Sequence, residues 1–209
     1  MNNTLLTGFM GSGKSSVGRL LARASERYFL DTDALIEARF GVSIGEIFKR
    51  DGEAAFRAAE RDAADFLARS VSNAVIATGG GMPVVCENLR SVGVVIYLKC
   101  DFETIAQRLA ADAENYKRPL AASIEALRDR FYSRLEIYEK SADFIINAAL
   151  PKESVLKEIV NISAAVETDL TDEEKEIIRE GRKHYAEHPE DYVSQEEAEK
   201  IIYGKTRNR

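Results

Sequence analysis

The sequence of 209 residues contains few of the residues that build zinc sites and disulfides, with two cysteines and two histidines. Cys86 and Cys100 do not stand in a paired spacing typical of zinc ligands. His184 and His188 are four residues apart and could share a helix face, but no glutamate motif accompanies them. We therefore expect no metal site built from cysteine or histidine, and a solvated helix face for the two histidines.

Long apolar runs are also missing. The longest, such as residues 92–98, fall well short of the about 20 residues that a membrane-spanning helix needs. Residues 1–4 lead into an apolar run without the basic leader of a signal peptide. We therefore expect a cytoplasmic protein that makes no membrane contact.

The sequence has no excess of basic residues. Its 29 lysines and arginines stand against 35 acidic residues, and the net charge is −6. Binding to nucleic acid requires a basic face, so we expect no nucleic-acid partner. The apolar share of 45% and the charged share of 31% are typical of an ordinary globular protein, and the length suggests one domain with an appendage.

Short apolar runs alternate with longer amphipathic segments through the first three quarters of the chain. These runs are the expected strands, at residues 4–7, 28–30, 74–77, 94–98 and 144–146. Alternating strands and helices indicate a parallel sheet covered by helices on both faces. The expected fold class is therefore α/β, with three α/β/α layers.

The character of the chain changes to polar and charged after about residue 165. Thr171 with Glu174, and Ser194 with Glu197, each fit a capping box, which predicts two helices. We expect a domain over residues 1–165 and a charged helical extension over residues 166–209. The extension could mediate a protein or oligomer contact, form a hairpin on the core, or be a solvated appendage with no catalytic role.

A complete phosphate-binding pattern, G-x-x-x-x-G-K-[ST], runs from Gly8 to Ser15 between an expected strand and an expected helix. Its glycines let backbone N–H groups converge on phosphate oxygens at a helix N-terminus. Lys14 is expected to reach the β- and γ-phosphates of ATP, and Ser15 to hold Mg²⁺. The expected nucleotide-binding residues are Gly11, Ser12, Gly13, Lys14, Ser15 and Ser16. The alternative is a glycine turn without a ligand.

Two aspartates end the second expected strand, beyond the carboxyl end where parallel sheets bind ligands. Asp31 and Asp33 are two positions apart, so in a strand both would point to one face. We expect Asp31 to hold Mg²⁺ and Asp33 to take the proton from an acceptor hydroxyl. Alternatively, one of them caps the helix that begins near Ala34.

Two further features suggest an acceptor site. Arg57 has Glu60 three residues later, and a carboxylate there can orient the guanidinium so that the remaining N–H groups grip a carboxylate ligand. The triplet of Gly79, Gly80 and Gly81 follows an expected strand, where glycine lets the backbone approach a ligand closely. The alternatives are a surface ion pair on a helix and a plain tight turn.

The order and spacing of these motifs resemble the motif series of shikimate kinases over residues 3–162. The series includes residues 45–48, Gly52 with Glu53, Arg118 before Pro119, and Arg134 four residues before Tyr138. The resemblance implies a nucleoside-monophosphate-kinase-like P-loop fold with a five-stranded parallel sheet. It also implies ATP-dependent phosphorylation of the 3-hydroxyl of shikimate, a step of chorismate and aromatic amino-acid biosynthesis.

The same resemblance implies roles for particular residues. Arg57 and Arg134 would grip the carboxylate of the acid, and Asp33 and Gly80 its hydroxyl groups, with Gly79 and Gly81 beside them. Arg118, on a lid at residues 110–123, would reach the phosphates and, with Lys14, spread the developing charge, while Asp33 takes the proton.

One residue departs from the family pattern, and one further residue is given a role. Ala121 stands where the family commonly has a second leucine, and the lid segment could instead be an ordinary connecting loop. Arg108 is assigned to the adenine side of the nucleotide.

Two other functions compete with this interpretation. A related small-molecule kinase, such as a gluconate kinase, would share the P-loop but have a different acceptor site. A regulatory nucleotide-binding module would bind ATP without transferring phosphate to a small acid. The resemblance favours ATP and shikimate as small-molecule partners of a monomer.

Overall fold

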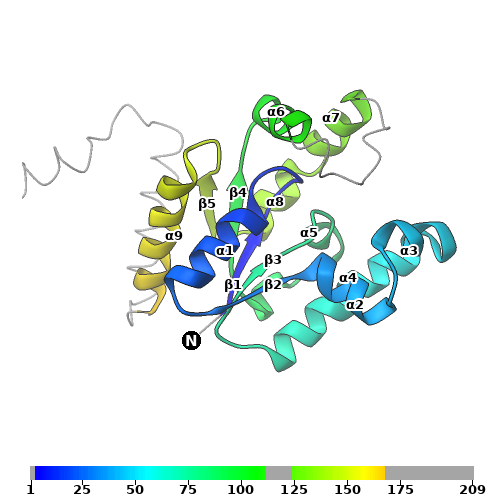
Figure 1. Ribbon diagram of the computed structural model, residues 1–209, viewed down its shortest axis with the longest axis horizontal. Helices are drawn as coiled ribbons and strands as arrows, with labels where there is room; N and C mark the ends of the chain where they lie inside the picture. The colour runs from blue at the N-terminus through cyan, green and yellow to red at the C-terminus, as the bar shows by residue number, and fades with distance from the viewer. Residues whose placement is uncertain (1–2, 112–123, 168–209) are drawn as a thin grey trace, which may run out of the picture. The chain divides into compact units, whose positions relative to one another are not determined.

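The structure is a computed structural model of the chain, and it describes residues 3–111 and 124–167. Five parallel strands form one sheet in the order β2-β3-β1-β4-β5 (Figure 1). Their bounds are β1 Asn3–Thr7, β2 Tyr28–Asp31, β3 Ala74–Ala77, β4 Gly93–Lys99 and β5 Phe144–Asn147. The five-stranded parallel sheet expected from the sequence is therefore confirmed.

Helices connect the strands throughout the described residues. They are α1 Lys14–Ala24, α2 Thr32–Phe40, α3 Ile44–Arg50, α4 Gly52–Ser70, α5 Met82–Val85, α6 Phe102–Ala111, α7 Ile124–Tyr132, α8 Leu135–Ser141 and α9 Lys152–Glu167, with a 3₁₀ turn at Leu89–Ser91. None of the described helices is long and apolar enough to cross a membrane.

The strands alternate their side chains between two hydrophobic cores. Leu6 and Ile96 pack into one core, which includes residues of α1, α6 and α9, while Leu5 and Val95 pack into a second core with α2, α3 and α4. In a strand, successive side chains point to opposite faces, so both faces of the sheet are buried. The result is the expected arrangement of three layers.

The strand order brings three loops to the same edge of the sheet. β3 lies between β2 and β1, and the chain crosses to the other side of β1 when it continues to β4 (Figure 1). The loops that follow β1, β2 and β3 therefore leave neighbouring carboxyl ends, beside the crossover where open α/β sheets bind ligands. These loops carry the phosphate-binding pattern, the two aspartates and the glycine triplet.

One local expectation is wrong. Strand β2 ends at Asp31, and α2 begins at Thr32, so Asp31 and Asp33 are not two positions of one strand. The helix starts early because the Asp31 side chain accepts a hydrogen bond from the backbone N–H of Asp33 and caps it. The helix cap considered as an alternative is therefore observed for Asp31, and it uses only Oδ1 of that side chain.

Several predictions lie outside the described residues. These are Arg118, the lid beyond Ala111, the two capping boxes and the extension from residue 168 onward.

Candidate active site

The loop between β1 and α1 has the backbone that its glycines allow. Gly8, Gly11 and Gly13 have φ angles of 141°, 80° and 96°, which side-chain-bearing residues rarely adopt. Gly13 is also the N-cap of α1. The loop therefore delivers the chain to a helix N-terminus, where backbone N–H groups and the helix dipole favour an anion.

Lys14 is held along this loop. Its Nζ donates hydrogen bonds of 2.9 Å to the carbonyl oxygens of both Gly8 and Phe9. The nearby Ser12 is buried, and its Oγ has no hydrogen-bond partner in the part of the chain that the structure describes. A buried polar atom without a partner is costly, so this hydroxyl is suited to a bound group such as a phosphate.

Ser15 and Asp31 form the oxygen pair that a divalent cation would need. The Ser15 hydroxyl, in the first turn of α1, donates a hydrogen bond of 2.9 Å to Oδ2 of Asp31 at the end of β2. Mg²⁺ prefers such hard oxygen ligands and completes its shell with substrate phosphates and water. The donor set present here therefore fits a divalent metal bound together with a nucleotide.

The second aspartate faces a different group. The side chain of Asp33 lies so close to Gly79 that a Cβ atom at this glycine would collide with Oδ1 of Asp33. Between the two aspartates, the buried Thr32 accepts a hydrogen bond of 2.8 Å from the N–H of Gly79 through Oγ1. Asp31 is thus turned to Ser15, and Asp33 lies against the glycine turn after β3.

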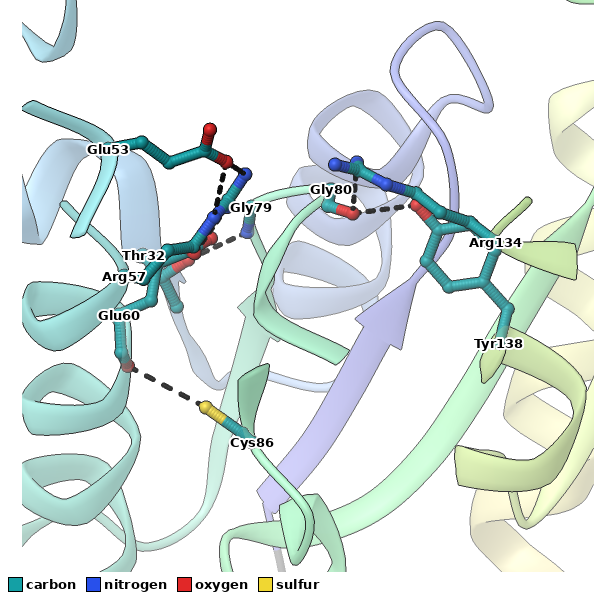
Figure 2. Close-up of polar contacts among 9 residues, drawn as sticks. All are labelled: Thr32, Glu53, Arg57, Glu60, Gly79, Gly80, Cys86, Arg134 and Tyr138. Atoms are coloured by element: carbon teal, nitrogen blue, oxygen red, sulfur yellow. Dashed lines mark hydrogen bonds and ion pairs between the residues drawn. The ribbon is translucent and has the colours of Figure 1, made fainter. Parts of the chain in front are cut away.

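Arg57 is bound by two carboxylates of its own helix, α4 (Figure 2). Its Nη1 donates to Oε2 of Glu60 at 2.6 Å, and its Nε and Nη2 donate to Oε1 of Glu53 at 3.1 and 2.8 Å. The pair with Glu60 is the one expected from the sequence. A Cβ atom at Gly81 would overlap Nη1 of Arg57, so the absence of a side chain there makes room for the guanidinium.

Glu60 is an acidic residue on an otherwise apolar helix face. Its side chain is 1% exposed, and the other buried residues of α4 are Phe56, Ala59, Ala63, Ala64 and Leu67. Its Oε1 has no hydrogen-bond partner among the described residues and would lie 3.3 and 3.0 Å from Cβ atoms built on Gly79 and Gly81. Burial raises the pKa of Glu60 above its ordinary value, although Arg57 opposes that shift.

Gly80, the middle glycine of the triplet, is held by two residues that lie outside α4. The carbonyl oxygen of Gly80 accepts hydrogen bonds from Nη1 of Arg134 at 3.0 Å and from Oη of Tyr138 at 2.7 Å. Figure 2 shows the guanidinium groups of Arg57 and Arg134 pointing toward one another across Gly80. Two cations and the backbone of a glycine turn therefore converge, an arrangement suited to a small anion with polar substituents.

Arg108 also lies beside the phosphate-binding loop. From the last turn of α6 its Nη2 donates to the carbonyl oxygen of Ala148 at 2.8 Å, and its Nη1 lies 3.5 Å from the carbonyl oxygen of Gly11. The guanidinium therefore links the loop after β1 to the segment after β5. The assignment of Arg108 to the adenine side of the nucleotide stays a prediction.

Three residues of the site were given no role from the sequence, namely Thr32, Glu53 and Tyr138. Thr32 lies between two aspartates whose charge marks them as candidates. Nothing near Thr32 in the sequence indicates its partner, because Gly79 is 47 positions away. Glu53 and Tyr138 belong to the motifs that resemble the family. Their spacing gave a signal, since each is four residues from a site arginine along the chain.

Comparisons with known proteins agree with this geometry. The family model described as shikimate kinase matches residues 10–164. A curated shikimate kinase of Helicobacter hepaticus is 42% identical over 160 residues, which cover 77% of this chain and 95% of the relative. The shikimate kinase of Geobacter sulfurreducens is 44% identical over 163 residues, covering 75% of this chain and 88% of the relative.

A solved structure shares the arrangement of the elements. The shikimate kinase from Acinetobacter baumannii, in complex with shikimate, superposes with a TM-score of 0.71 at 30% sequence identity. The match covers 81% of this chain and 96% of that one. The similarity therefore extends across most of the length of these relatives, and the family model leaves residues 165–209 unmatched.

Proposed function

The chain belongs to the shikimate kinase family, and on that premise we propose that it transfers the γ-phosphoryl group of ATP to the 3-hydroxyl of shikimate. The chain is thus a phosphotransferase with an alcohol group as acceptor, and its product feeds aromatic amino-acid biosynthesis. The observation that carries the proposal is the pair of arginines that face one another across Gly80, next to the phosphate-binding loop.

The donor side is formed by the loop after β1. The N–H groups of Gly11, Ser12, Gly13 and Lys14 bind the phosphates with Ser16 at the helix start, and Lys14 moves from the loop carbonyls to the β- and γ-phosphates. Ser15 and Asp31 would hold Mg²⁺, which would supply charge neutralisation for the bound phosphates. Arg108 lies on the adenine side.

The acceptor side is formed by the elements around the glycine triplet. Arg57 and Arg134 bind the carboxylate of shikimate, because a guanidinium presents several N–H donors in one plane that match a carboxylate. The backbone of Gly79, Gly80 and Gly81 approaches the ring closely. The unpartnered Oε1 of Glu60 faces the same turn and is suited to a hydroxyl group or a water molecule.

Asp33 is the residue that handles the proton. Its carboxylate lies against Gly79, apart from the oxygen pair of Ser15 and Asp31. There it orients the acceptor hydroxyl toward the γ-phosphate and takes the proton as the new P–O bond forms. Phosphoryl transfer depends mainly on positioning and charge neutralisation, so Lys14 and Arg118 stabilise the charge that develops on the moving group.

Some parts of the proposal rest on the sequence. We propose that residues 110–123, which beyond Ala111 lie outside the described residues, act as a lid that carries Arg118 and excludes water from the transfer. We also propose that residues 1–165 form the catalytic domain and that residues 166–209 are a charged extension, either a site of protein contact or a solvated appendage. The protein acts as a monomer in the cytoplasm.

One assay separates this function from its competitors. ADP release is measured by a coupled assay with ATP and Mg²⁺, first alone, then with shikimate, and then with gluconate. Turnover that depends on shikimate supports the proposal, while turnover with gluconate would favour the related small-molecule kinase. ATP binding without acceptor-dependent ADP release would favour the regulatory module.

A further inference from the structure

Glu53 binds one edge of the guanidinium of Arg57, the residue assigned above to the carboxylate of the substrate. A single oxygen of Glu53, Oε1, accepts hydrogen bonds from both Nε and Nη2 of Arg57 (Figure 2). This edge of an arginine, with two parallel N–H groups, is one that carboxylate ligands recognise. The structure therefore holds a carboxylate of the protein where a carboxylate of the acceptor would bind.

The two carboxylates that bind Arg57 differ in how firmly they are held. The Glu60 side chain is 1% exposed, whereas the Glu53 side chain is 67% exposed. Glu60 cannot leave without stranding a buried charge, but an exposed ion pair contributes only about 0–1 kcal/mol. Glu53 is therefore the partner that an incoming anion can displace.

The hydrogen bonds and charges around Arg57 favour such a displacement. Arg57 has five N–H groups and one positive charge, and the two glutamates already use three of those N–H groups. With both glutamates ionised, their charges outweigh that of Arg57, so the attraction of an anionic acceptor falls mainly to Arg134 on the other side of Gly80. Removing Glu53 from the edge frees two donors and restores the attraction.

A second position for Glu53 is suggested by its electrostatic neighbours. Arg130 on α7 and Arg134 before α8 both lower the pKa of Glu53, although its hydrogen bond with Arg57 is the largest cause. These cations lie on elements other than α4, so the displaced carboxylate stays in a positive environment. The exchange would keep one anion on the Nε–Nη2 edge of Arg57 at all times, with Glu60 still bound to Nη1.

We propose that Glu53 is an internal stand-in for the carboxylate of the acceptor, and that shikimate must displace it from Arg57 to bind. This inference rests on the proposed function, which assigns Arg57 to the acceptor. Because a neutral group would replace a charge-assisted pair with a weaker hydrogen bond, Glu53 makes the site selective for carboxylated acceptors. Glu53 is thus a specificity-determining residue.

The test compares Glu53→Gln with the matched variant Asp65→Asn. Asp65 pairs with Arg69 four residues later on the same helix, so the control removes the same charge from a pair in which both side chains are exposed. If Glu53 competes with shikimate, Glu53→Gln lowers the KM for shikimate by about two- to fivefold, the range of one exposed ion pair, while kcat stays unchanged. Asp65→Asn leaves both constants unchanged.

A direct binding measurement completes the test. Calorimetric titration with shikimate and with its neutral methyl ester should show tighter binding of the acid to Glu53→Gln and unchanged binding of the ester. A raised KM would mean that Glu53 orients Arg57 instead, and an unchanged KM would mean that the pair has no role; either result overturns the inference. If the unmodified protein itself shows no turnover with shikimate, the proposed function fails first and the inference fails with it.

Discussion

The Oη atom of Tyr138 donates a hydrogen bond of 2.7 Å to the carbonyl oxygen of Gly80, across 58 positions of sequence. The Tyr138 ring is fully buried and stacks on Tyr97 with the ring centroids 5.2 Å apart. In a trans peptide the next N–H points opposite to the carbonyl, so fixing Gly80 also directs the N–H of Gly81 away from Tyr138. Tyr138 is therefore a positioning residue for the glycine turn.

Replacing this tyrosine tests that relationship. Tyr138→Phe keeps the stacked ring and removes one hydrogen bond, whose net contribution is about 1 kcal/mol, so the KM for shikimate should rise about fivefold. The KM for ATP should not change. The half-exposed Tyr132 on α7 provides the control, and Tyr132→Phe should match the unmodified protein. Equal changes in both KM values would indicate a general loss of structure instead.

The two aspartates near the end of β2 should respond differently to the loss of charge. Asp33→Asn removes the proton acceptor, so kcat should fall by about 10²- to 10⁴-fold while the dissociation constant of ATP stays nearly unchanged. Asp31→Asn alters the partner of the Ser15 hydroxyl, so it should shift the Mg²⁺ concentration needed for half-maximal rate. Loss of ATP binding in Asp33→Asn would show that its role is misassigned.

The glycine turn should not accept side chains. Gly81→Ala places a methyl group where Nη1 of Arg57 lies, so the guanidinium must move and the KM for shikimate should rise at least tenfold. Overpacking of this kind also costs about 1–3 kcal/mol, which a lower midpoint of urea unfolding would report. Gly45→Ala is the control, because its nearest neighbour, Ser43 Oγ, lies 3.9 Å away from the added Cβ atom.

The buried carboxyl of Glu60 should make stability depend on pH. Burial raises its pKa in the folded protein, so the folded state holds the proton more tightly than the unfolded chain does. This contribution to the free energy of unfolding is present at pH values below the ordinary glutamate pKa of about 4.3 and is lost as the pH rises through the raised value.

Glu60→Gln isolates this contribution. The amide oxygen of the variant can still accept a hydrogen bond from Arg57. As the pH rises through the raised pKa of Glu60, the unmodified protein should therefore lose stability relative to the variant. Urea titrations at several pH values measure the difference. A difference that does not change with pH would contradict a raised pKa.

The features that the sequence predicts well are those determined by nearby residues. The loop from Gly8 to Ser15 needs only its own glycines and the following helix, and the pair of Arg57 with Glu60 needs only one helical turn. The sequence places the start of α2 near Ala34, whereas the helix begins at Thr32. The hydrogen bond that Asp31 accepts from the N–H of Asp33 determines this start, and a sequence pattern locates such a boundary only to within one or two residues.

Contacts between distant segments could not be predicted in this way. The bonds of Gly80 with Arg134 and Tyr138, and of Gly79 with Thr32, depend on the strand order that brings these loops together. The triplet suggested a close approach, but only the folded structure identifies Asp33 and Arg57 as the groups that fill the space. The competition between Glu53 and a ligand likewise needs the exposed fractions of both glutamates.

Analysis of the reaction product tests the central claim most directly. The protein is incubated with ATP, Mg²⁺ and shikimate, and the product is examined by phosphorus–proton correlation NMR. The account predicts one phosphate ester, coupled to the proton on carbon 3 of the ring, in an amount equal to the ADP formed. Inorganic phosphate in place of the ester, or an ester on another hydroxyl group, would contradict it.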